Sequence, residues 1–146
     1  MTGIDAVLNN DAGYYDISLN TSGDILTADF FDTTITYSVF GERRADRDEV
    51  IPSQNRRGWI ANFEEYENGS KVWLYEQERL TRTTINNLQD EVVKSLQWLV
   101  ADGYAVAIDD VTVTSTREKV TLSLTVRRSS DKIERRFYEL WNNTGL

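Results

Sequence analysis

Two clusters of carboxylates are the residues whose types and spacing could do chemistry. One lies in the stretch Glu64–Glu67 and the other in Glu76–Glu78. Glycoside hydrolases place two carboxylates ~5 to 10 Å apart, one as the acid and one as the nucleophile or base. A sequence does not show such a separation, and acidic clusters are ordinary on protein surfaces. We therefore favour a surface role and keep a cell-wall glycosidase as the alternative.

A third acidic pair, Asp109–Asp110, stands where a strand pattern slips by one residue. The apolar positions Val106 and Ile108 precede the pair, and Val111 and Val113 follow it, so the alternation changes side. Such a slip is typical of a β-bulge. A divalent metal ion needs more converging oxygen ligands than one pair supplies. We predict a bulge with two exposed acids.

The absence of two residue types removes most catalytic chemistry. The 146 residues include no histidine and no cysteine. A Ser-His-Asp triad, a histidine or thiolate metal site, a cysteine nucleophile and a disulfide are therefore excluded. The sequence also lacks a glycine-rich phosphate loop and the GxSxG and HExxH motifs. We predict a protein that is not an enzyme, with no catalytic residue, cofactor or metal.

The charge of the chain is negative and unevenly distributed. The net charge of -8 disfavours binding to nucleic acid, and no apolar run approaches the ~20 residues of a membrane helix. The first 41 residues hold six Asp and no Lys or Arg, whereas residues 117–136 hold seven basic and three acidic residues. This asymmetry suits head-to-tail contacts between neighbouring subunits. Two solvated faces are the interpretation that we favour.

Residues 41–58 form a long polar stretch that contains the only proline, Pro52. Loops of this length in a compact domain are usually functional or ordered by a partner. Arg43, Arg44 and Arg47 stand there among four acidic residues. Such a mixture suits an ion-pair network with another protein surface, where Arg is favoured. A simply solvated loop is the equal alternative.

The first forty residues show strand patterns after an irregular arm. Residues 1–13 contain breakers and predict that arm, and residues 14–20 alternate apolar and polar side chains as a strand does. A glycine turn follows, and residues 25–27 can start a short return strand. Residues 30–40 are rich in β-branched and aromatic side chains, which favours a strand. A helix stays open there because the run is short.

The clearest element is a helix over residues 83–103. Thr83 or Thr84 can cap its start, and Gly103 can end it in the left-handed conformation. Its apolar face is spaced by three and four residues and consists of Ile85, Leu88, Val92, Leu96 and Leu99.

Three strand patterns follow the helix: "YAVAIDDVTVT", "KVTLSLTVRR" and "KIERRFYELW". The middle one points Val120, Leu122, Leu124 and Val126 to one side, and short turns give antiparallel hairpins. The fold class is therefore α+β, with a long helix packed on a C-terminal three-stranded antiparallel meander, N-terminal strands and a long polar loop. We expect the arm, residues 1–13, and one domain, residues 14–146.

The four tryptophans are expected to hold this domain together. Gly58 lets the chain turn so that Trp59 folds back onto the core, and a short helix with Ser70 as its N-cap carries Trp73. Trp73 would then lie against the long helix. The predicted structural core comprises Trp59, Trp73, Leu96, Trp98, Leu99 and Trp141.

The order of several short motifs resembles a known family. "DISL", "SGDILT", "SVFGERRAD", "RRGW", "GSKVWLYEQERLT", "SLQWLVADGYA" and "FYELW" follow one another over residues 14–141. This order is similar to the Mu-type baseplate wedge family of contractile-tailed phages, which is related to the smaller sheath-initiator wedge proteins.

The resemblance implies a structural protein made in the host cytoplasm and built into the virion, at the tail baseplate. Its partners would be other baseplate wedge proteins, the tail sheath and tube-proximal proteins, in a six-fold ring that carries the first sheath ring. No nucleic acid or membrane is implied. In related sheath initiators, the sheet pairs with strand arms of sheath subunits. A small regulatory binding module outside any virion is a third possibility.

Related sheath initiators carry a Glu-Pro-Arg motif after the long helix, where this chain reads "ADGYAVAI". The Arg43–Arg44 group is our substitute for that docking motif. The residues predicted to contact other proteins are Glu42, Arg43, Arg44, Arg47, Arg57, Arg127 and Arg128.

Overall fold

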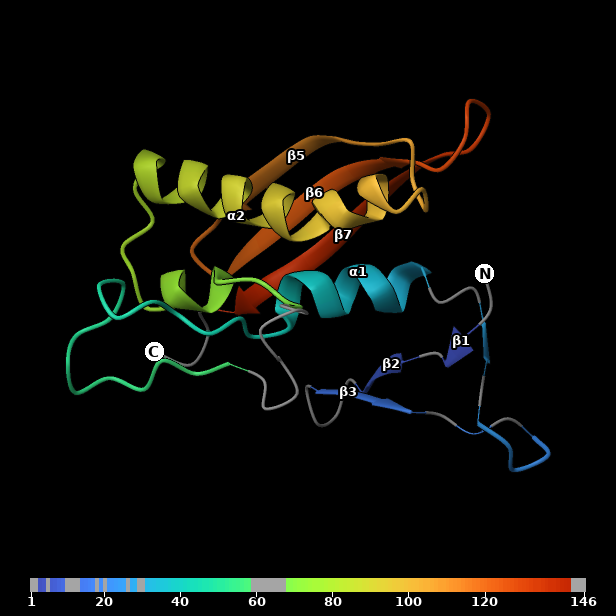
Figure 1. Cartoon of the computed structure of the whole chain (residues 1–146), viewed down its shortest axis with the longest axis horizontal. Helices are drawn as coiled ribbons and strands as arrows, with labels where there is room; N and C mark the ends of the chain where they lie inside the picture. The colour runs from blue at the N-terminus through green and yellow to red at the C-terminus, as the bar shows by residue number, and fades with distance from the viewer. Residues whose placement is uncertain are drawn as a thin grey trace. The chain divides into compact units, whose positions relative to one another are not determined.

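The computed structural model describes residues 3–4, 6–9, 14–17, 19, 21–25, 27–28, 31–58 and 68–142. The chain divides into two compact units, residues 1–37 and residues 38–146, and the boundary falls within helix α1 (Phe31–Phe40). Figure 1 shows the course of the chain.

The first unit contains two small antiparallel strand pairs. β1 (Gly3–Ile4) pairs with β4 (Thr27–Ala28), and β2 (Ala6–Asn9) pairs with β3 (Tyr14–Ile17). The arm predicted over residues 1–13 is therefore not irregular throughout, because β1 and β2 lie in it. Strands of two and four residues are too short to show a periodicity in the sequence.

Helix α1 replaces the strand that the sequence favours over residues 30–40. Phe31, Ile35 and Val39 are spaced by four residues and are at most 1% exposed, so they form one buried face of the helix. The strand prediction is wrong because burial of this face outweighs the weak preference of Thr and Ile for strands.

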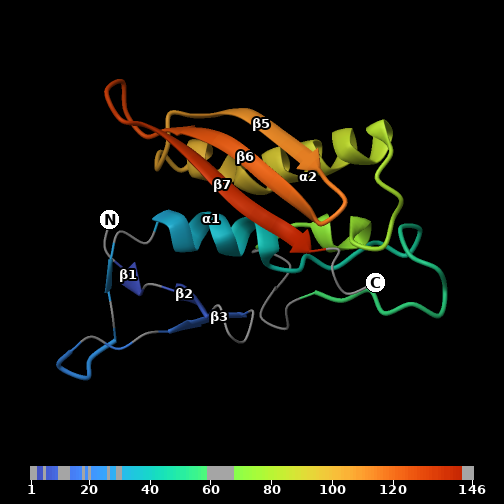
Figure 2. The same cartoon turned by 180° about the vertical axis from the view of Figure 1, so that it is seen from behind.

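The second unit is a helix on an antiparallel sheet. Strands β5 (Ala107–Ser115), β6 (Lys119–Arg127) and β7 (Ile133–Asn142) lie in the order β5-β6-β7, and helix α2 (Arg82–Ala101) packs on one face. Figure 2 shows the opposite face from behind, with α2 beyond the sheet. The α+β class is confirmed.

Apolar side chains of α2 and β6 fill the core of the second unit. Ile85 is only half-buried, although it belongs to the predicted apolar face of α2. In α2 and β6, eight apolar side chains have no exposed surface: Leu88, Val92, Leu96, Leu99, Val120, Leu122, Leu124 and Val126.

The ends of α2 have specific backbone partners. Thr81, not Thr83 or Thr84, is the N-cap, and its hydroxyl accepts the Thr84 N–H at 3.2 Å. The prediction was two residues late because any threonine of this run satisfies the capping pattern. At the other end Gly103 has φ +80°, as predicted, and Leu99 O accepts the Tyr104 N–H at 2.9 Å.

Two bulges modify the sheet. The β5–β6 register shifts between Asp109 and Thr112, as predicted, and Asp110 has φ +51°. The Asp109 carboxylate accepts a hydrogen bond from Arg127 at 2.9 Å. The second shift, in β6–β7, lets Trp141 face the buried Val120 across the strands. Because opposed residues share a face, Trp141 lies on the same side of the sheet as α2.

Candidate interaction surface around the polar loop

The polar loop, residues 41–58, is anchored to Ser70. Arg43 donates its backbone N–H to Ser70 O at 2.9 Å, and Ser70 donates its own to Gly41 O at 2.8 Å. The Ser70 hydroxyl donates to Val39 O and accepts the Val72 N–H. Ser70 is buried, and its hydrogen bonds connect α1, the loop and the following helix.

The short helix after Ser70 is η1 (Val72–Tyr75), a single 3₁₀ segment. Its N-cap is Lys71, without a side-chain cap, so the prediction of Ser70 as N-cap is wrong by one residue. The Ser70 hydroxyl donates a hydrogen bond to Val39 O. This bond fixes Ser70 against the end of α1, and the helix starts one residue later than predicted.

The middle of the loop folds back on itself. Ala45 donates its N–H to Arg56 O at 3.0 Å, and Arg56 Nε donates to Ala45 O at 2.6 Å. Gly58 has φ +103°, and a Cβ placed there would come within 2.7 Å of Arg44 Cβ. Gly58 thus allows the close approach that the sequence predicts as a sharp turn. The loop is ordered by contacts within the chain.

Lys71 binds two acids of the loop. Its ammonium lies 3.0 Å from Asp46 Oδ2 and 2.8 Å from Glu49 Oε2, and its side chain is only 13% exposed. Burial acts to lower the pKa of Lys71, but the hydrogen bonds to Glu49 and Asp46 outweigh it, so the net shift is upward. Part of the loop's charge is therefore already paired within the chain.

The pKa values of the two partner carboxyls, Glu49 and Asp46, shift in the opposite direction. Burial acts to raise the pKa of Glu49, but hydrogen bonds from Lys71 and from the Asp46 backbone N–H outweigh it and lower the net value. The hydrogen bond from Lys71 lowers the pKa of Asp46. Both carboxyls thus hold their charged form to a lower pH in the folded state than in the unfolded state.

Replacing Lys71 by methionine should lower the free energy of unfolding by about 1 kcal/mol at pH 7. Because the folded pKa values of Glu49 and Asp46 lie below the ordinary 4.5 and 3.8, this stabilisation is lost as the pH falls through them. Urea denaturation from pH 7 to pH 3 should show the gap between variant and parent narrowing below about pH 4. The control Lys119→Met, at an exposed site, should show no such narrowing. A difference in the free energy of unfolding between Lys71→Met and the parent that stays constant with pH would contradict the ion-pair assignment.

Several of the residues predicted to contact other proteins lie around Trp73. Its indole N–H donates to Arg43 O at 2.9 Å, and the Arg57 guanidinium carbon lies 4.9 Å from the ring centroid. Arg57 also binds Glu42 Oε1 at 2.8 Å. Trp73 itself is half-buried rather than part of the closed core. Glu42, Arg43 and Arg57 are thus brought together around one indole.

The other predicted contact residues lie elsewhere. Arg44 and Arg47 are exposed on the loop. Arg127 pairs with Asp109 across the sheet, and Arg128 lies 3.8 Å from Glu134. The predicted set therefore forms two groups, one on the polar loop and one beside the β6–β7 turn.

The remaining tryptophans depart from the predicted core. Trp98 is 37% exposed, donates its N–H to Ser38 Oγ at 3.0 Å and contacts Tyr104 edge to face. It follows the buried Leu96 by two residues, about 200° around the helix, so it lies off the buried face that Leu96 belongs to. Trp141 is half-buried. Trp59 and the acids Glu64–Glu67 lie outside the described residues.

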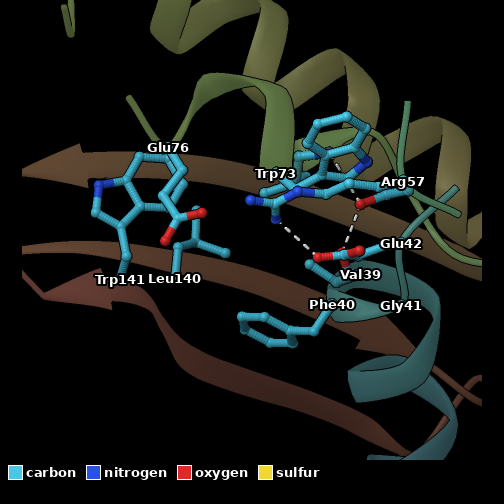
Figure 3. Close-up of a pocket in the computed structure, with 11 residues that line it drawn as sticks. Val39, Phe40, Gly41, Glu42, Arg57, Trp73, Glu76, Leu140 and Trp141 are labelled. Carbon is cyan, nitrogen blue, oxygen red and sulfur yellow. Dashed lines mark hydrogen bonds and ion pairs between the residues drawn. The ribbon is translucent and has the colours of Figure 1, made fainter. Parts of the chain in front are cut away.

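A pocket of about 150 Å³ lies between η1, the end of α1 and the end of β7. Figure 3 shows Trp73, Arg57 and Glu42 on one side and Glu76, Leu140 and Trp141 on the other. The sequence did not predict this pocket, because its two indoles are far apart along the chain. The available signal was a tryptophan in a short apolar helix, VWLY, that polar residues flank on both sides.

The described ranges contain no group of three or more acids that could hold a metal ion. Within the same ranges, no helix combines the length and the apolar character needed to cross a membrane.

Comparison with known proteins gives a family. The family model described as "Phage protein GP46" matches residues 31–133, from α1 to the start of β7. Over 89 residues the chain is 34% identical to "Baseplate protein gp46" of Escherichia phage Mu, an alignment that covers 59% of this chain and 61% of that protein. The match includes the polar loop, η1 and α2, whose geometry defines the surface above. The chain belongs to the phage protein GP46 family.

Proposed function

We propose that the protein is a structural subunit of a phage tail baseplate. The observation that carries this proposal is its membership of the GP46 family, together with its 34% identity to a baseplate protein of phage Mu. The lack of histidine and cysteine agrees with a role in assembly rather than in catalysis.

We further propose that the subunit joins wedge proteins in a six-fold ring around the tail tube and carries the first ring of the sheath. Strand β7 supports this role, since it is an edge of the β5-β6-β7 sheet. An edge strand can accept an extended segment of a partner through main-chain hydrogen bonds. Residues 1–13 are proposed to act as an arm that contacts a neighbour.

Charged and apolar groups on the surface suit such contacts. Arg44 and Arg47 project from the polar loop and are proposed to meet acidic groups of a wedge partner. On the sheet, Ile133 and Phe137 are 60% and 66% exposed, and the Arg135 guanidinium lies over the Phe137 ring. Exposed aromatic and arginine side chains are the groups enriched in protein interfaces.

Cryo-electron microscopy of particles from the source phage tests the proposed function. The chain should occupy a six-fold ring at the junction of baseplate and sheath, with β7 or the polar loop against another protein. Absence of the chain from the particle would overturn the proposal. The carboxylates of Glu64 and Glu65 would then be replaced by glutamine in a cell-wall lysis assay.

Phe137→Ser should separate stability from assembly. Because the side chain is 66% exposed, its loss should change the free energy of unfolding by less than about 0.5 kcal/mol. Incorporation into particles, measured by complementation and mass spectrometry, should fall clearly. Tyr37→Ser, at a side chain that is 62% exposed in helix α1, is the matched control and should incorporate normally. Equal incorporation of both variants would remove this face from the proposed interface.

A further inference from the structure

One wall of the pocket already holds a cation between an indole and a carboxylate. The Arg57 guanidinium lies 4.9 Å from the Trp73 ring centroid and 2.8 Å from Glu42 Oε1, and all three residues line the pocket. The negative face of the indole and the charge of the carboxylate favour the same cation. The chain itself thus shows which chemical group these surroundings hold.

The opposite wall has an indole and a carboxylate of its own, but no guanidinium among the described residues. Trp141 supplies a second indole, and Glu76, an exposed residue of the same pocket, supplies a second carboxylate (Figure 3). Among residues 31–58 and 68–142, no cation forms an ion pair with Glu76. Within these residues, the second indole and carboxylate therefore lack the cation that Arg57 supplies to the first pair.

We propose that the Trp141–Glu76 wall receives an arginine or lysine side chain from a neighbouring polypeptide. The apolar side chains of Val39, Val72 and Leu140 line the same pocket and suit the aliphatic stem of such a residue. The net charge of -8 favours the approach of a basic partner. Only the identity of the neighbour, another baseplate protein, rests on the proposed function.

Nuclear magnetic resonance of the full chain can test this with Nα-acetyl-arginine amide as the probe. The four tryptophans give four indole N–H signals, which single Trp substitutions assign. The Trp141 signal should shift in a saturable way, with a dissociation constant on the order of 1 mM, because one cation–indole contact and one ion pair give weak binding. The corresponding citrulline amide, which is neutral and of the same shape, should bind at least about tenfold more weakly.

Two carboxylate variants make the test specific. Glu76→Gln should weaken arginine amide binding at least about fivefold, whereas Glu78→Gln, which removes the same charge two residues away and outside the pocket lining, should change it by less than about twofold. Both sites are exposed, and thermal melts should show that both variants fold.

Equal binding of the arginine and citrulline amides, or equal binding by parent and Glu76→Gln, would overturn the proposal. This result is independent of the particle experiment. A chain found in the baseplate ring that does not bind the arginine amide keeps its proposed function and loses this site. A chain absent from the particle that binds the probe at Trp141 keeps the site, with a partner other than a baseplate protein.

Discussion

Replacing Gly69 by alanine should lower the free energy of unfolding by about 2 to 5 kcal/mol. Gly69 has φ +94°, which side-chain-bearing residues rarely adopt, and a Cβ there would lie 2.6 Å from the Gly41 carbonyl carbon. Neither backbone can move away without disturbing the hydrogen bonds between Ser70 and the loop, at Gly41 and Arg43. Chemical denaturation followed by tryptophan fluorescence measures the loss.

Gly103→Ala is the control that separates backbone conformation from close contact. Gly103 has a similar φ of +80°, but a Cβ there would meet nothing within 4 Å. Its replacement should cost only about 1 kcal/mol, the usual cost of losing a glycine at a helix C-terminus. Equal losses for the two variants would show that the approach of Gly69 to Gly41 contributes nothing.

Leu96→Ala should cost about 3 to 5 kcal/mol, the range for a leucine removed from a closed core. Leu96 has no exposed surface and lies in the middle of the buried face of α2. Thermal and urea denaturation should agree on this loss. Far-ultraviolet circular dichroism should show that the remaining fold is unchanged at low temperature.

Trp98→Ala provides the comparison within the same helix. Although tryptophan is larger, Trp98 is 37% exposed, so its loss should cost about 1 to 2 kcal/mol, including the hydrogen bond to Ser38. A cost for Trp98→Ala as large as that for Leu96→Ala would restore Trp98 to the core, where the sequence had placed it.

The parts of the fold that the sequence predicts are those with one buried face and a regular period. The alternation in β6 and the slip at Asp109–Asp110 are visible because every second residue of a strand meets the core. Over α1 the sequence favours a strand and leaves a helix open, because Thr33, Thr34 and Thr36 favour strands locally. The size of Trp98 favours burial, but its position off the apolar face of the helix leaves it partly exposed.

The surface around the polar loop depends on pairings that local sequence cannot reveal. Lys71 lies 22 and 25 residues from the acids that it binds, and many pairings of the loop's charges are compatible with its composition. The same holds for Trp73 and Arg57, which meet only after the loop has folded back. The order of the motifs nevertheless indicates the family, because a resemblance between sequences can be seen without knowledge of these contacts.

Strand β7, which is an edge of the β5-β6-β7 sheet, also bears on how the protein behaves by itself. A strand edge that can take a partner's segment can equally pair with another copy, which is a route to aggregation. Four charged residues interrupt the apolar pattern of β7: Glu134, Arg135, Arg136 and Glu139. Charges on an edge strand discourage such pairing. These residues should therefore raise the concentration that the protein by itself can reach before it precipitates.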